Sequence, residues 1–500
     1  MLVHSPVIRA FSAPLPHASG LNPPSSAVRL GLAASAIAVL FGAFLVAPMP
    51  IWAGQPSGPP PSSASVEPVG WAGLILALFF VVAVCLPFRP YLLARRAVAR
   101  APVPFRLLVV LTVMLALIAL LIYPALGSDI FDYVGFERMW VVYGDNPLTA
   151  LPANRPGDWA SSLVWYPDRT PAYGPVWAMV TWPLVRLAGD SAAAEVVGYK
   201  LLSLLAYGAC CWCVWSSVAP ARRQRALVSF AWSPLVLLEV LGKVHNDVLV
   251  ALAAVGAVWL ATRARQLSLA TSAIGGLVKA TSLAAAPAIA VYLWRRDGWR
   301  SLAPAAMGAV VLAILSYAPF WAGPATLAPL WNQTSRLVWS PASLLIVVSD
   351  TLLPTGSTSL VVRVALGLVW LGAVAVVLSR ARLVTRAGLA AASAWLLIAT
   401  VLLLTSAVFA HYLVPVIALA AVADDPRLDG VVMGLSIGGL AAYATALLGL
   451  AFGTAWIGSE AYVLTGTLLL LAPAAVVAAR YLRGAQAVRL ALRRASSSSL

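Results

Sequence analysis

The chain is a series of long apolar runs separated by short polar loops. Runs of about 20 residues without charges are long enough to cross a bilayer as helices. Of its 500 residues, 61% are hydrophobic and 10% are charged, whereas a soluble domain carries about 25% charged residues. Because so few charges cannot cover a water-facing surface, we expect lipid to cover most of it. The sequence therefore predicts an all-α, polytopic transmembrane helix bundle.

The charges are unevenly placed along the chain. Lys and Arg number 33 against 17 Asp and Glu, a formal charge of +16. Such an excess can indicate a nucleic-acid partner, but here the Arg residues gather in short loops, where the positive-inside rule puts them. We therefore assign the charge to membrane topology and expect the bilayer, and no nucleic acid, as a partner. The cysteines lie in apolar runs and are interpreted as packing residues: Cys85, Cys210, Cys211 and Cys213.

The pattern of runs and loops divides the chain into four regions. The predicted regions are a disordered cytoplasmic N-terminus at 1–27, two transmembrane helices with a Pro-rich outer link (55–68) at 28–105, a main transmembrane domain at 106–483 with a large outer loop at 127–172, and a basic cytoplasmic tail at 484–500.

Basic residues beside each run set its predicted orientation. The loop from Arg89 to Arg106 holds five Arg and no acidic residue, so we place it inside, whereas the outer loop has an acidic excess. The run at 173–187 is short and broken by proline, so we expect it to lie in the outer interface or to re-enter. About twelve full crossings are predicted, at 29–49, 70–88, 106–124, 194–217, 226–242, 247–262, 301–321, 359–378, 430–453, 460–481 and twice within 387–423.

Two long apolar segments have cytoplasmic signals at both ends. A straight helix cannot return to the side on which it began. The segment between Arg265 and Arg295 is therefore predicted to form two half-length helices that meet near Lys279. The segment at 387–423 is predicted to turn near His411.

Unusual polar residues gather at the predicted outer turns. Ionisable groups within or at the edge of a membrane are costly, so each is a candidate for function. The candidates are Asp129 and Asp132 after the third span, Lys243, His245, Asn246 and Asp247 at one turn, Lys279 at the half-helix bend, and His411 and Tyr412 at another turn.

Each candidate also has a plainer interpretation. The turn at 243–247 could be a polar connection at the lipid headgroups. Asp129 could cap a helix that begins near Ile130, a role compatible with catalysis. Asp132 would lie on a neighbouring part of the same helix face and competes with Asp129. Lys279 could pair with a lipid phosphate or with a carboxylate such as Asp247.

This set of residues suits the transfer of a sugar. Such transfer needs a carboxylate that takes the proton of the acceptor hydroxyl, and cations that hold the departing phosphate. Asp129 at the water edge could supply the first, and Lys279, His245 and Lys243 the second. A nucleotide-sugar enzyme would need a soluble Rossmann-like domain, and no loop exceeds about fifty residues. We therefore expect a donor presented from the bilayer. No cofactor is implied, and the need for a divalent cation is left open.

Three segments of the chain resemble a known class of enzymes. They are Ser128-Asp129-Ile130-Phe131-Asp132-Tyr133, Tyr143-Gly144-Asp145-Asn146-Pro147 and Tyr173-Gly174-Pro175-Val176-Trp177. The chain resembles the GT-C class of membrane glycosyltransferases and is most similar to the actinobacterial polyprenol-phosphate-mannose-dependent α-1,6-mannosyltransferases. In these, an acidic residue of the first large outer loop is the catalytic base, followed by a G-x-N-P turn and a Y-G-P segment. The match extends in order over roughly residues 105–425.

The resemblance implies an activity and its residues. It implies inverting transfer of mannose from a β-linked polyprenyl phosphate to a hydroxyl of a mannan or lipoglycan acceptor, with an α-1,6 linkage. It implies a multi-pass plasma-membrane protein with an extracytoplasmic active site. Asp129 would be the base, and the substrate-binding set would be Lys279, His245, Asn246, Asp247, Lys243, Tyr173, Asn146, His411 and Tyr412.

Two alternatives remain on the sequence alone. The same fold could use another lipid-linked sugar. A lipid or sugar transporter would be expected to have pseudo-symmetric halves and charges along a path between the faces. The candidate residues instead gather on one predicted face, which favours the enzyme.

Overall fold

The computed structural model describes residues 25–42, 70–122, 124, 129–327, 329–330, 336–352 and 358–497. Within these ranges the regular structure is helical, and the extended pairings are two isolated bridges. The predicted all-α fold is confirmed. The predicted disorder up to residue 24, the link at 55–68 and Ser128 of the first motif lie outside the described residues.

The N-terminal part contains four helices: α2 Ser26–Gly42, α3 Trp71–Cys85, α4 Phe88–Arg100 and α5 Phe105–Leu121. The stretch from Arg89 to Arg100 was predicted as part of an Arg-rich inside loop, but it is the helix α4. Its placement on the inside stays a prediction. Ala, Leu and Arg are strong helix formers, and the segment has one buried face with helical spacing. That face includes Tyr91, Ala94, Arg95 and Val98.

The predicted outer loop is partly helical. It contains α6 Asp129–Val141 and the short 3₁₀ turns η3 Pro152–Asn154 and η4 Ser161–Leu163, and it leads to α7 Pro175–Ala188 and α8 Ala192–Ser217. The 14-residue α7 is about 21 Å long at 1.5 Å per residue, shorter than a hydrocarbon core of about 30 Å. Its placement in the outer interface stays a prediction.

The span predicted at 226–242 is broken in the structure, and whether the bent segment crosses the membrane stays a prediction. The segment consists of α9 Arg223–Ala231, α10 Pro234–Val236 and a π-helix, η6 Leu237–Gly242, with a bend of 48° between its halves. Pro234 has no N–H to continue the helix and its ring clashes with the preceding turn. The loop after the π-helix leads directly into the N-terminus of α11 at Asp247.

Both predicted breaks in long apolar segments are confirmed. The predicted span at 247–262 is α11 Asp247–Ala261. The first broken segment after it contains α12 Arg265–Val278, the 3₁₀ helix η7 Ala280–Ala285 and α13 Ala286–Asp297. Lys279 lies in extended backbone between α12 and η7. The second segment contains α18 Arg386–Leu403, η11 Ala410–Leu413 and α19 Val414–Val422, so that His411 lies in the break.

The remaining long helices are α14 Trp299–Tyr317, α16 Pro341–Leu352, α17 Thr358–Arg380, α20 Pro426–Ala442, α21 Ala444–Phe452 and α22 Glu460–Ser497. No helix was predicted at α16. The helix α20 lies close against α22 because Gly434 and Gly438 are four residues apart, and a Cβ at either would overlap the backbone of α22. Small residues at this spacing are typical of packed membrane helices.

Seven helices in the described part of the chain are long and apolar enough to cross a membrane, or up to eight if the bent α9–η6 pair is one span. Five shorter apolar helices accompany them, so the count of twelve crossings stays a prediction. The helix α17 leaves Leu360, Val361 and Leu368 more than 60% exposed. Such a face is suited to lipid, and the protein is therefore a polytopic helical membrane bundle.

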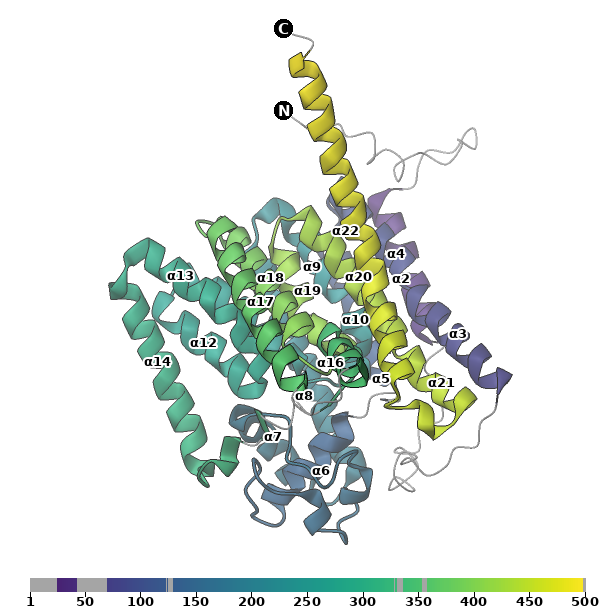
Figure 1. Cartoon of the computed structure of the whole chain (residues 1–500), viewed down its shortest axis with the longest axis vertical. Helices are drawn as coiled ribbons and strands as arrows, with labels where there is room; N and C mark the ends of the chain where they lie inside the picture. Colours follow the sequence, from purple (N-terminus) through teal and green to yellow (C-terminus); the bar gives the residue numbers. More distant parts are fainter. Residues whose placement is uncertain are drawn as a thin grey trace.

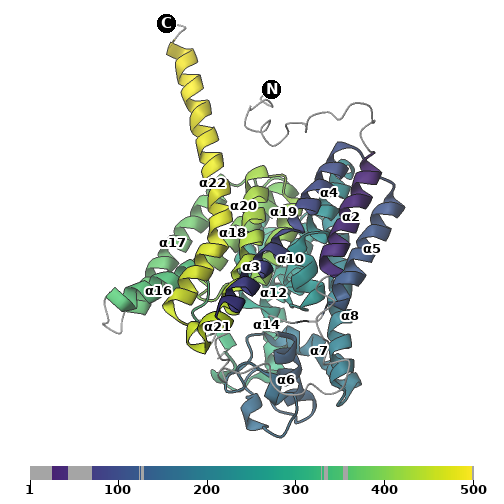
Figure 2. The same cartoon turned by 90° about the vertical axis from the view of Figure 1, so that its right-hand side faces the viewer.

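The polar segment lies at one end of the molecule. In both views α6 and α7 are grouped below the bundle, and the C-terminal part of α22 extends from the opposite end (Figure 1, Figure 2). Asp129, the first residue of α6, has a carboxylate oxygen within 4.8 Å of a ring nitrogen of His411, and the charge of Lys279 acts on it. The two breaks therefore lie beside the N-terminus of α6.

Candidate active site

Charged side chains from four stretches of the chain (129, 239–247, 279 and 411) meet beside the N-terminus of α6. Most of them were predicted at separate turns, and the structure brings them into one network, here called the charged cluster. Its members are Asp129, Glu239, Lys243, His245, Asp247, Lys279 and His411.

Asp129 has the most solvent-exposed side chain among the acidic members of this cluster. Its side chain is 28% exposed, whereas that of His245 is 1% exposed. Oδ2 of Asp129 lies 3.3 Å from Nδ1 of His245 and accepts a 3.2 Å hydrogen bond from the Tyr173 hydroxyl. Burial would raise the pKa of Asp129, but the charge and hydrogen bond of His245, with the charges of His411 and Lys279, hold it well below its usual range. Asp129 is therefore an ionised, partly accessible carboxylate.

His245 lies between two carboxylates. Its Nε2 is 3.1 Å from Oε2 of Glu239, on the opposite side of the ring from Asp129. Burial alone would lower the pKa of His245, but Asp129 and Glu239 outweigh it and raise the pKa to about 9. The ring stacks on His411 with centroids 3.8 Å apart. At neutral pH His245 is an imidazolium held by its neighbours.

The two lysines of the cluster have carboxylate partners within the protein. Nζ of Lys279 donates to Asp247 at 2.9 Å and lies 3.9 Å from the centre of the Tyr412 ring. Asp247, the carboxylate that the sequence offered as an alternative to a lipid phosphate, is thus the partner of Lys279 in the structure. Nζ of Lys243 lies 3.0 Å from Glu239. Both ammonium groups are buried and charge-balanced.

Sequence reasoning missed Glu239. It is fully buried and also accepts a 3.0 Å hydrogen bond from the Tyr443 hydroxyl. A usable signal was present, because a single carboxyl in the apolar run Leu237-Leu238-Glu239-Val240-Leu241 is costly unless it is paired.

The backbone around the cluster is irregular. Glu239 lies in the π-helix η6, and π-helical turns often occur at functional sites. Val244, between Lys243 and His245, has φ of 66°, a left-handed conformation that is an outlier for a β-branched residue. Strain of this kind persists only where the surroundings impose it. The loop is therefore shaped to present Lys243 and His245 to Glu239.

Asp129, His245 and His411 could also be considered as metal ligands, since one ligand atom from each lies within 4.8 Å of the others. The two imidazole rings are stacked, with centroids 3.8 Å apart and planes inclined by only 23°, so their in-plane lone pairs lie in two separate, nearly parallel planes. Ligands of a metal ion must converge on one point. In this arrangement the three residues fit a charged cluster better than a metal site.

Asp132, the competing candidate base, has different surroundings. Its carboxylate accepts a 2.8 Å hydrogen bond from the backbone N–H of Trp165 and is buried. Burial and the charge of Asp129 raise the pKa of Asp132 to about 7, against the opposing effects of the Trp165 amide and Arg336. Asp132 therefore supports the outer segment, one turn along α6 from Asp129.

The second and third motif segments, 143–147 and 173–177, have different contacts. Oδ1 of Asn146 accepts from the N–H of Leu148 at 3.0 Å, and its Nδ2 donates to the carbonyl of Phe320 at 2.7 Å. These contacts assign Asn146 to turn formation, and they do not join it to the charged cluster. Gly174 donates to the carbonyl of Val278 at 3.0 Å, which places Tyr173 beside the Lys279 break.

Asn246 has an unusual environment. It is 2% exposed, and neither atom of its side-chain amide has a hydrogen-bond partner among the described residues. Its backbone N–H donates to the Tyr133 hydroxyl at 3.1 Å. Buried amides are normally hydrogen-bonded, so this side chain retains the capacity to bind a polar ligand.

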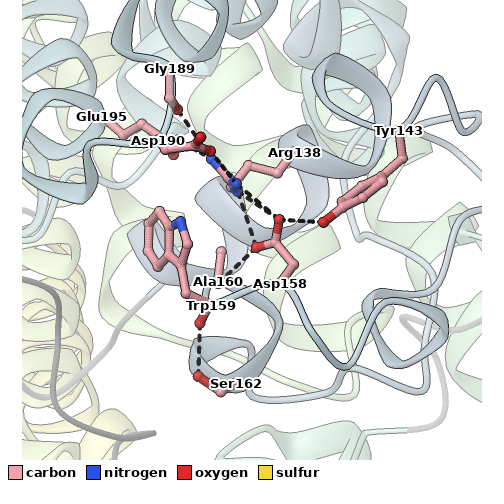
Figure 3. Close-up of polar contacts among 9 residues, drawn as sticks. All are labelled: Arg138, Tyr143, Asp158, Trp159, Ala160, Ser162, Gly189, Asp190 and Glu195. Carbon is pink, nitrogen blue, oxygen red and sulfur yellow. Dashed lines mark hydrogen bonds and ion pairs between the residues drawn. The ribbon is translucent and has the colours of Figure 1, made fainter.

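Arg138 anchors the outer segment to the bundle. Its guanidinium binds Asp158 at 2.9 Å, Asp190 at 2.9 Å and Glu195 at 3.2 Å (Figure 3). The Tyr143 hydroxyl donates to Asp158 at 2.9 Å. These contacts join α6 and the loop at 158 to the connection between α7 and α8. They anchor the C-terminal turn of α6 without belonging to the charged cluster.

Arg336 is a second residue that sequence reasoning missed. It is half-buried, and its guanidinium lies 4.0 Å from the centre of the Tyr166 ring. Its charge acts on Asp132 and Tyr173, so it lies within electrostatic reach of the site. Among the described residues no carboxylate forms an ion pair with it. No motif or span marks this position in the sequence.

Comparison with known proteins identifies the family. Residues 28–295, more than half of the chain, match the family described as alpha-(1->6)-mannopyranosyltransferase, N-terminal domain. This range includes every member of the charged cluster except His411. No curated protein matches the chain. The chain belongs to the α-(1→6)-mannopyranosyltransferase family and is a membrane mannosyltransferase.

Proposed function

We propose that the protein transfers mannose from polyprenyl-phosphate mannose to a hydroxyl of a mannan or lipoglycan acceptor, with inversion and an α-1,6 linkage. We place this reaction at the extracytoplasmic face of the plasma membrane. The observation that carries the proposal is Asp129, a partly exposed and ionised carboxylate at the end of a membrane bundle, beside buried cations.

Asp129 would act as the general base. As the acceptor oxygen bonds to C1 of the mannose, the bond from C1 to the phosphate oxygen breaks, and the acceptor proton passes to Asp129. The carboxylate is ionised and open on one side, as a base must be. The product is the glycoside, and polyprenyl phosphate departs.

Cations near Asp129 would stabilise the departing phosphate. Arg336 is the first candidate, because no described carboxylate pairs with it and a guanidinium can bind two phosphate oxygens at once. Lys279 is the second, although it would have to share its charge with Asp247. We do not assign Lys243 and His245 to the phosphate, because Lys243 is ion-paired with Glu239 and His245 with Asp129. The free amide of Asn246 is a candidate for a sugar hydroxyl.

A lipid-linked donor agrees with the architecture. The described segments at the lower end of the bundle form short helices and turns, without a separate nucleotide-binding sheet. Apolar helix faces such as that of α17 lie open to lipid. A polyprenyl chain can remain in the bilayer while its phosphate reaches the site.

The proposal is tested by supplying membranes that contain the protein with radiolabelled polyprenyl-phosphate mannose. Labelled glycan that is cleaved by an α-1,6-specific mannosidase is the expected product. Membranes without the protein provide the baseline. Label that stays in the lipid fraction in both preparations would contradict the proposal.

A further inference from the structure

Glu239 is connected to His245 twice. Its backbone carbonyl accepts a 2.9 Å hydrogen bond from the N–H of His245, and its Oε2 lies 3.1 Å from Nε2 of the same residue. The first contact closes the turn that follows the π-helix. The second places a carboxylate against the ring nitrogen that faces away from Asp129. Main chain and side chain of one residue thus fix both the position and the orientation of His245.

The imidazole ring of His245 has little freedom to move. One nitrogen faces Asp129, the other faces Glu239, and one ring face stacks on His411. An imidazole can donate from both nitrogens only when it is protonated on both. Two flanking carboxylates therefore favour the imidazolium, and they orient it along the line that joins them.

We propose that Glu239 is a positioning residue of the transfer reaction, which acts by holding a protonated His245 against the carboxylate of Asp129. The inference rests on the proposed function of Asp129 as the base. The charge of His245 keeps Asp129 ionised, and its fixed position directs the free oxygen of Asp129 toward the acceptor. Glu239 itself is buried and is not expected to contact either substrate.

A purely structural role for Glu239 is the competing explanation. Glu239 is also the ion-pair partner of Lys243 at 3.0 Å and the acceptor for Tyr443. Loss of its charge would leave a buried ammonium without a partner, which is destabilising. A structural role would change the amount of folded protein. A positioning role would change the turnover of the protein that does fold.

The test is a double-mutant cycle on the full-length protein in liposomes. Glu239→Gln keeps the size of the side chain and removes its charge. His245→Asn keeps an N–H that can reach Asp129 and removes the nitrogen that faces Glu239. We expect Glu239→Gln to lower kcat by about 10- to 100-fold with the KM for the lipid donor unchanged, as for a misplaced catalytic group. Because Glu239 acts through His245, adding Glu239→Gln to His245→Asn should cause no further loss.

Two further variants separate positioning from folding. Glu239→Gln with Lys243→Met removes both charges of the buried pair, and its kcat should remain low if positioning is the role. Recovery of kcat in this variant would overturn the inference in favour of charge balance. Glu137→Gln removes another buried carboxyl outside the cluster and should keep the wild-type kcat.

The remaining outcomes are distinct. Wild-type kcat in folded Glu239→Gln, or losses that multiply in the double mutant, would overturn the inference alone. A wild-type protein that does not transfer mannose from the lipid donor would overturn the proposed function, and this inference with it.

Discussion

At the scale of single residues, Asp129 and Asp132 lie one helical turn apart but in different electrostatic surroundings. Asp129 is held ionised by His245, whereas burial and the charge of Asp129 raise the pKa of Asp132 to about 7. An Asn at position 132 resembles the protonated form that Asp132 often has at neutral pH. An Asn at position 129 removes the proposed base.

We therefore expect opposite results from the two substitutions. Asp129→Asn should lower the transfer rate by about 10²- to 10⁴-fold, the usual loss for a general base, at near-normal expression. Asp132→Asn should keep the rate within about 10-fold of wild type, because Asn can still accept from Trp165. Single-turnover rates with the lipid donor measure both. A severe loss in Asp132→Asn with a mild one in Asp129→Asn would move the base to Asp132.

Which cation binds the donor phosphate depends on whether a carboxylate of the protein already neutralises it. Arg336→Ala should raise the KM for the lipid donor by about 10- to 100-fold, as expected for loss of about 1.5–3 kcal/mol of charge-assisted hydrogen bonding. Lys279→Ala should have the smaller effect on this KM, because Asp247 already shares its charge. Arg155→Ala, which removes an arginine paired with Asp145 away from the cluster, is the control. An unchanged KM in Arg336→Ala would remove Arg336 from the donor site.

At the scale of elements, α6 carries a buried acid, Glu137, that lies outside the charged cluster. Glu137 is 3% exposed, and burial raises its pKa to about 8 against the opposing effect of Thr181. An unfolded Glu has a pKa of about 4.3. Between these values the folded state holds a proton that the unfolded state has lost, so the contribution of Glu137 to stability falls as pH rises.

Glu137→Gln does not titrate and should therefore gain stability relative to wild type as pH rises from about 5 to about 8. Thermal unfolding in detergent across this range measures the difference in midpoint. A difference that is constant with pH, or that grows toward acid, would contradict the assignment.

Some features of the elements could be predicted from the sequence, and others could not. Charge signals at both ends of an apolar run require a return, so the breaks near Lys279 and His411 were predictable. The bend in 226–242 was not, because Pro234 alone does not indicate a π-helix. The contacts among Asp129, His245 and Lys279 were predicted only as a shared face, since pairing depends on how distant helices pack. Glu239 was visible as a lone acid, but its partners were not.

At the scale of the whole molecule, the proposed reaction requires one face for the charged cluster and the opposite face for the Arg-rich connections. The lower end of the bundle holds α6 and α7, and α22 extends from the other end (Figure 1). From the positive-inside rule we propose that the acidic segment lies outside.

Cysteine labelling can test this orientation in intact cells. In a background without the four native cysteines, Asp145→Cys should react with a membrane-impermeant maleimide added outside, and Arg222→Cys should react only after the cells are opened. Both positions are partly exposed. Labelling of both from the same side would contradict the topology.

Delivery of the sugar by a bilayer lipid is the step on which the proposed function depends. It can be measured by giving the purified protein in liposomes an acceptor glycan and one of two labelled donors, polyprenyl-phosphate mannose or a nucleotide-activated mannose. We expect labelled glycan from the lipid donor alone, and its loss with Asp129→Asn. Transfer from the nucleotide donor in liposomes that contain no polyprenyl phosphate would show that the lipid is not the donor.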